Sequence, residues 1–199
     1  MSRGPGGIFT SLSALKHNMS VEKQPEHGYT RFSGACLPLD PLVKLNVDAG
    51  YLQNSKKVSL DCVIKDHNGQ VLGTSCRITY SVQSIFAAEA IAFPHGLQFA
   101  QDMGFSCFII EGDARTIVRR VQSTESNLSD IRSLVIYIKE KNEEFRECHF
   151  HFIPRHANQV AHALASKGLR ESTDLFWVKD APPSILSLAA ADPRHLEPP

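Results

Sequence analysis

Apolar and polar residues alternate strictly over residues 43–48, and the alternation ends at Asp48. This period of two predicts a strand with a carboxylate near its end. Two further β-prone runs, 58–64 and 71–80, flank the Asp-His-Asn-Gly sequence at 66–69, which is typical of a tight hairpin turn. The first part of the sequence therefore predicts three consecutive antiparallel strands.

Helical spacing of apolar residues follows over residues 84–103, and this segment contains Glu89. Pro94 lies inside it, and an interior proline removes one backbone hydrogen bond, so we expect the helix to be kinked or split near Phe93. The continuous apolar run 105–110 predicts a strand buried on both faces. Glu111, Gly112 and Asp113 end this run, and Asp113 could cap a helix at 114–123.

Two more helices, 128–144 and 157–167, are predicted on either side of a fifth strand at 148–153. This order predicts an α/β fold with a mixed five-stranded sheet, three antiparallel strands and then two parallel ones, flanked by helices. A crossover through the Glu89 helix would place the fourth strand parallel to the first and most simply beside it. Asp48 and Asp113 would then be neighbours at the centre of the sheet.

The chain divides into three parts by composition. We expect a disordered leader at 1–41, one domain at 42–170, and a C-terminal tail at 171–199 that docks partly through Phe176 and Trp177. The first 19 residues contain Arg3 and Lys16 and no acidic residue, which faintly resembles an organelle transit peptide. A disordered leader fits this composition better.

Charge and cysteine usage restrict the partners and the compartment. Lys plus Arg and Asp plus Glu both number 21, so no global positive field attracts nucleic acid, and such binding must depend on local patches. The five cysteines form no CxxC pair, which favours a reducing intracellular setting, nuclear or cytoplasmic, with organelle targeting as the alternative. No apolar run approaches the roughly 20 residues that a membrane span needs, and we expect a monomer.

The acids Asp48, Glu89 and Asp113 are candidates for a shared metal site. Mg²⁺ prefers oxygen ligands, and two such ions about 4 Å apart can hold the attacking water and the leaving oxygen of a phosphodiester. The alternative is that each acid is only a capping or surface residue. An aspartate at the end of an apolar strand argues against this, since a buried carboxylate is costly unless it is paired or bound to metal.

Five segments in the same order resemble the ribonuclease H type 1-like, reverse transcriptase-associated domain of plant retroelement-derived proteins. They are KLNVD at 44–48, VIKDHNGQVL at 63–72, AEA at 88–90, IEGDA at 110–114 and PRHANQVAHALA at 154–165. The resemblance covers about residues 43–170. It implies a mixed sheet and endonucleolytic cleavage of the RNA strand of an RNA:DNA hybrid, with Mg²⁺ or Mn²⁺ held by Asp48, Glu89 and Asp113.

This resemblance also shows where the chain departs from the family pattern. A fourth acidic ligand is expected on the last helix, where this sequence has His162 instead, and neutral imidazole is a poor Mg²⁺ ligand. Ala49-Gly50 replaces the usual Gly-Ser or Gly-Ala, and Pro94 is unusual in its helix. The alternative function is therefore a catalytically weak or inactive domesticated nucleic-acid-binding module. A different hydrolase on the same fold, such as an exonuclease, is a third reading.

Basic and polar residues near these acids could contact nucleic acid. Arg155 could bind phosphate, while Asn158 could cap the last helix or order the loop before it. Arg115 and Arg119 could bind phosphate as well, although an ordinary solvated helix face explains them equally.

Histidines are concentrated in the same region. His156 could move a proton during product release, although a solvated loop histidine is the simpler interpretation. His149 and His151 lie two residues apart, close in sequence to His156 and His162, which raises zinc binding as an alternative. Their spacing matches no common zinc module.

Overall fold

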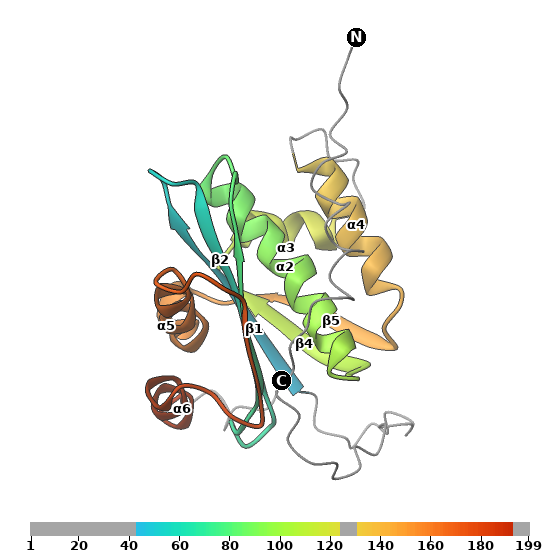
Figure 1. Ribbon diagram of the computed structural model, residues 1–199. Coiled ribbons are helices and arrows are strands. Elements are labelled where there is room, and N and C mark those ends of the chain that lie inside the picture. Colours follow the sequence, from blue (N-terminus) through green and yellow to red (C-terminus); the bar gives the residue numbers. More distant parts are fainter. Residues whose placement is uncertain (1–42, 124–130, 193–199) are drawn as a thin grey trace. The chain divides into compact units, whose positions relative to one another are not determined.

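The computed structural model describes residues 43–123 and 131–192, which form a mixed sheet with helices on both faces (Figure 1). The strands are β1 (Val43–Leu52), β2 (Lys57–Lys65), β3 (Val71–Thr79), β4 (Cys107–Gly112), β5 (Glu147–Phe152) and β6 (Leu175–Val178). The helices are α2 (Ile85–Asp102), α3 (Arg115–Gln122), α4 (Arg132–Asn142), α5 (Gln159–Gly168), α6 (Pro183–Ala190) and the 3₁₀ helix η2 (Arg155–Ala157). The predicted leader at 1–41 and the first three residues, 128–130, of the predicted helix 128–144 lie outside the described residues.

The sheet has the order β5-β4-β1-β2-β3-β6, which confirms the predicted mixed α/β fold and adds a sixth strand. β1, β2 and β3 are antiparallel neighbours, and β4 lies parallel beside β1 with β5 parallel at its other edge. The β2–β3 turn forms as expected, since the backbone N–H of Gly69 donates to the Asp66 carbonyl at 3.0 Å. Gly69 has a φ of 78°, which glycine adopts without strain.

Helix α2 continues through Pro94 as one element, so of the predicted kink or split near Phe93 the split is wrong. The Ser84 hydroxyl caps its start by accepting from the Ala87 N–H at 3.1 Å. Gly96 allows a close approach to β1, because a Cβ at this position would lie 2.5 Å from Val47 Cγ1. Packing of this face onto the sheet outweighs the one backbone bond that proline removes.

The two faces of the sheet carry different helices (Figure 1). Helices α2, α3 and α4 cover the larger apolar core, to which they contribute residues such as Phe93, Ile117 and Ile138. Helices α5 and α6 cover a smaller core through Leu164 and Ile185. α5 packs on β1, β2 and β3, and it therefore lies over the half of the sheet that contains Asp48.

The segment after residue 172 forms β6 and α6, which the sequence pattern did not predict. β6 pairs antiparallel with β3, so that Trp177 lies beside Thr74 and packs against the smaller core. An ion pair of 2.8 Å joins Lys65 Nζ on β2 to Asp192 Oδ2 just after α6. None of the described helices has both the length and the apolar character needed to cross a membrane.

Candidate functional site

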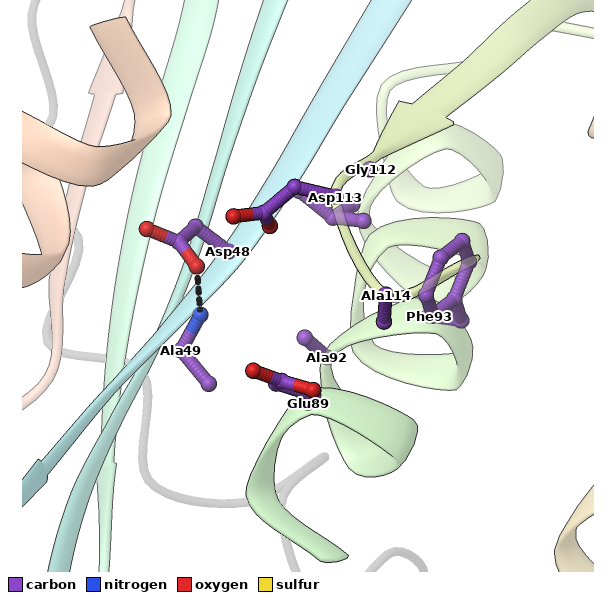
Figure 2. A pocket seen from close by; sticks show the side chains of 9 residues that line it. Asp48, Ala49, Glu89, Ala92, Phe93, Gly112, Asp113 and Ala114 are labelled. Atoms are coloured by element: carbon purple, nitrogen blue, oxygen red, sulfur yellow. Dashed lines mark hydrogen bonds between the residues drawn. The ribbon is translucent and has the colours of Figure 1, made fainter. Parts of the chain in front are cut away.

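Three acids on different elements face one small hollow. Asp48 lies on β1, Glu89 on the second turn of α2, and Asp113 directly after β4. The hollow is lined by Val47, Asp48, Ala49, Glu89, Ala92, Phe93, Gly112, Asp113 and Ala114. Figure 2 shows the carboxyl groups of the three acids turned toward the same space.

Asp48 is the most buried of the three carboxylates, with 8% of its surface exposed. Burial raises its pKa, and the negative charge of Asp113 raises it further. The Ala49 N–H donates to Asp48 Oδ1 at 2.8 Å, and His162 Nδ1 lies 2.9 Å from Oδ2. These two contacts fix the carboxylate and partly offset the rise of its pKa.

Glu89 is half-buried and shares this repulsion. Its pKa is raised first by burial and then by the charges of Asp113 and Asp48, while Arg155 lowers it. The three acids therefore act on one another electrostatically. A bound cation would relieve this repulsion, so the charges of the three acids favour cation binding in the hollow.

His162 lies between Asp48 and Arg155. Its Nδ1 contacts Asp48, and Arg155 Nη2 lies 3.0 Å from its Nε2. The same Nη2 lies 3.3 Å from Nδ1, so the guanidinium lies over the imidazole ring and is close to both of its nitrogens. The residue at the expected fourth-ligand position is thus hydrogen-bonded to the first ligand candidate.

Asn158 anchors the start of α5 to β1. Its Nδ2 donates to the Val47 carbonyl at 2.9 Å, and its side chain is 1% exposed and forms no cap hydrogen bond with α5. Asn158 occupies the N-cap position of α5, but the prediction that its side chain caps the helix is wrong, and its contact with nucleic acid stays a prediction. The hydrogen bond instead holds α5 next to the residue that precedes Asp48.

The prediction that Asp113 caps the next helix is also wrong. α3 begins at Arg115 after Ala114, and it has no side-chain cap hydrogen bond. The Asp113 side chain is consequently available to the hollow (Figure 2).

The other basic candidates are exposed on α3 and η2, and none of them lines the acid hollow. The Arg115 guanidinium packs over the Phe152 ring at 4.3 Å from its centroid, and Arg119 is exposed on α3. His156 is exposed in η2. His149 is 3.0 Å from Glu147, so it is paired within its own strand.

The donor set suits a divalent cation, but the side chains as placed do not form a ready ligand cluster. Over residues 43–123 and 131–192, no group of three or more His, Cys, Asp or Glu side chains is arranged to hold a metal ion. This applies to the acids and to the histidines considered for zinc. Carboxylate oxygens on three converging elements nevertheless fit Mg²⁺ or Mn²⁺ in kind. Since His162 already contacts Asp48 Oδ2, a cation would share this carboxylate with the histidine.

Asp61 is a buried acid that the sequence did not single out. It is the direct cross-strand partner of Asp48 and is 0% exposed. Burial raises its pKa to about 7, and the charge of Asp48 adds to the rise. Ser59 and Cys76 lie close enough to offset part of it, although within the described residues neither carboxyl oxygen forms a hydrogen bond of ordinary geometry.

Known proteins match both the sequence and the fold. A family model described as reverse transcriptase-like matches residues 46–168. RNase H1 from the halophilic archaeon Halobacterium salinarum NRC-1 is 21% identical with a TM-score of 0.59, over 64% of this chain and 97% of that chain. The N-terminal RNase H domain of a Mycobacterium tuberculosis protein is 20% identical with a TM-score of 0.56, over 65% of this chain and 94% of that chain.

An RNase H1 isolated from compost by a metagenomic approach was solved in complex with an RNA/DNA hybrid. In that complex it is 21% identical to this chain with a TM-score of 0.57, over 64% of this chain and 96% of that chain. At such identities the likeness establishes the fold alone. No curated protein matches the sequence.

Proposed function

The chain belongs to the reverse transcriptase-like family, and on this premise we propose that it binds RNA:DNA hybrids and cleaves their RNA strand endonucleolytically with Mg²⁺ or Mn²⁺. The observation that carries the proposal is the convergence of Asp48, Glu89 and Asp113 on one hollow of a ribonuclease H fold. Solved relatives with this fold include one bound to an RNA/DNA hybrid.

Asp48, Glu89 and Asp113 would hold the divalent cations. When bound, two such ions activate a water and stabilise the leaving oxygen of the phosphodiester. The chain's own contribution is placement. The Ala49 N–H orients Asp48, and Asn158 keeps α5 against β1. Arg155 adds positive charge beside Glu89, where a substrate phosphate would approach.

Three arginines and one histidine extend from this hollow as candidate phosphate contacts: Arg155, Arg115, Arg119 and His156. All four are exposed on η2 or α3, next to the elements that carry the acids. Such contacts would hold the backbone of the hybrid without reading its sequence. His156 would also be placed to move a proton as product leaves.

The proposal is tested by cleavage of an end-labelled RNA in an RNA:DNA hybrid with Mg²⁺ or Mn²⁺. Asp48→Asn should lower the rate by more than about 100-fold, because loss of a ligand exceeds the effect of losing a residue that only supports one. Asp102→Asn makes the same change on an exposed site of α2 and should cleave like the wild type. Absence of metal-dependent cleavage by the wild type would refute the enzyme proposal.

A non-catalytic nucleic-acid-binding module is the second candidate. The observation in its favour is the hydrogen bond between His162 and Asp48, which occupies an oxygen that a cation would need. Fluorescence anisotropy with labelled hybrid in EDTA measures binding without turnover, and comparison with the cleavage assay separates the two candidates. Hybrid binding without cleavage in either metal would support this candidate.

The wider inferences from the sequence resemblance complete the proposal. The resemblance suggests derivation from a plant retroelement, and the sequence composition suggests a monomer with a nuclear or cytoplasmic location, organelle targeting being the alternative. A reading by composition places the domain at 42–170.

A further inference from the structure

A second hollow lies between the start of α5 and the end of α6. Its volume is about 590 Å³, and it is lined by Arg155, His156, Gln159, His162, Ala163 and Leu188. It adjoins the acid hollow, because His162 lines it and also contacts Asp48. A strand that passes the three acids would therefore reach it directly.

The lining combines positive and planar groups with an apolar wall. Arg155 and His156 are exposed and can meet a phosphate, and the histidine rings and the guanidinium can stack on a base. Ala163 and Leu188 supply the apolar wall, where both are partly buried against the smaller core. The volume lies within the range of about 300–1,000 Å³ that is usual for small-molecule pockets.

These properties fit an unpaired nucleotide better than a paired one. In a duplex the base faces are stacked on their neighbours, so the protein meets phosphates, sugars and groove edges. The face of a base can contact an apolar wall beside a phosphate-binding arginine only when that base is not stacked on its neighbours. Leu188 is on α6, outside the residues 46–168 that match the family model, so this part of the wall comes from the segment that follows the matched domain.

We propose that this hollow binds an unpaired nucleotide of the nucleic-acid strand that passes the acid site. Arg155 contacts its phosphate, and its base lies against Ala163 and Leu188. The inference rests on the proposed function, since it extends the same substrate beyond its paired part. It makes a hybrid with a single-stranded overhang the preferred ligand over a blunt one.

The test compares dissociation constants for a blunt RNA:DNA hybrid and for the same hybrid with a short single-stranded overhang. Fluorescence anisotropy in EDTA keeps cleavage out of the measurement. The overhang should tighten binding by about tenfold, the effect of stacking one base. Leu188→Glu should bring the ratio of the two constants to about one, because it places a negative charge in the apolar wall.

Leu186→Glu is the matched control, since it makes the same change on an exposed position of α6 that does not line the hollow. It should keep the wild-type ratio. Gln159→Glu tests the hollow from α5 and does not threaten folding, because an acid is favourable in the first turn of a helix. It should also reduce the ratio, while Ser166→Glu, exposed later on α5, should not.

Equal affinity of the wild type for both hybrids would overturn this inference and leave the proposed function standing. So would an unchanged ratio in both Leu188→Glu and Gln159→Glu. A change of oligomeric state in Leu188→Glu, with no overhang preference in the wild type, would mean that protein covers the hollow and would equally overturn it. Failure to bind either hybrid would refute the proposed function as well.

Discussion

The sheet face under α2, α3 and α4 buries a continuous apolar core, whereas the face under α5 and α6 combines a smaller core with polar side chains. Ser59, Asp61 and Thr74 are buried on the second face, and their side-chain oxygens form no hydrogen bond within the described residues. The first face also buries a polar pair, Ser75 and His95, but these two are hydrogen-bonded at 3.1 Å.

This difference separates stability from chemistry. Burial of apolar surface stabilises the fold in proportion to its area, so most of the stability belongs to the α2 face. Buried polar groups without partners destabilise it, and Asp61 lies directly across from Asp48. The side chains of Asp48 and His162 meet on this α5 face, whereas Glu89 and Phe93 reach the acid hollow from α2, so the site draws on both faces.

The largest expected effect is on the apolar face. Phe93 is 1% exposed and packs near Phe150 with ring centroids 6.1 Å apart. Phe93→Ala should lower the free energy of unfolding by about 3–5 kcal/mol, measured by urea denaturation. Phe176→Ala removes the same side chain from a position that is 48% exposed and should lower it by about 1 kcal/mol or less. Both rings lie on the α2 side of the sheet, since Phe176 packs near Phe99, so similar losses in the two variants would contradict the assignment of stability to the buried core of that face.

The second prediction concerns Asp61 on the α5 face. Its folded pKa of about 7 lies above the ordinary value of 3.8, so between these values the folded state holds a proton that the unfolded state has lost. The free energy of unfolding should therefore fall as pH rises from about 4 to 7 and then level off.

Asp61→Asn should remove this fall and stabilise the protein at pH 8, relative to the wild type, on the order of 3 kcal/mol. The measurement is urea denaturation at several pH values in EDTA. Asp66→Asn, in the exposed β2–β3 turn, provides the control with the same loss of charge. A wild-type stability that does not fall over this range would show that Asp61 ionises normally.

The smallest predicted effect concerns His162, where a change in metal binding should alter both cleavage and stability. His162→Asp would supply the fourth carboxylate, and it should raise Mg²⁺-dependent cleavage by about tenfold and lower the Mg²⁺ concentration for half-maximal rate. The added negative charge beside Asp48 should also make thermal stability depend more strongly on Mg²⁺. His151→Asp on the exposed face of β5 is the control. An unchanged Mg²⁺ dependence in His162→Asp would show that this position takes no part in metal binding.

The sequence was sufficient to predict the parts of the fold in which apolar residues recur at a regular spacing. Alternation, the Asn-Gly turn and helical spacing predicted the first five strands, and chain order placed β4 beside β1. Asp113 follows the end of β4 as predicted, but the prediction that the first strand ends at Asp48 is wrong, because β1 continues to Leu52. Helix α2 kept Glu89 although Pro94 argued for a break, because packing through Gly96 is a tertiary effect that local sequence does not encode.

Other features depend on register and on distant contacts. β6 has four residues, too few for a clear alternation, and it forms only because β3 offers a free edge. Asp61 stands alone in an apolar strand, and its proximity to Asp48 follows from the strand register. The Asn158 and His162 contacts join residues more than 100 positions apart in the chain, which no local pattern reveals.

Helix α5 is tied to the sheet at both of its ends. Asn158 holds its start to the Val47 carbonyl, and Lys57 Nζ on β2 donates to the Leu169 and Glu171 carbonyls just beyond its end. A helix held in this way does not move as a lever when substrate arrives. Access of a cation to the acid hollow then depends on rotation of single side chains such as His162, which must break its contact with Asp48, rather than on a shift of the backbone.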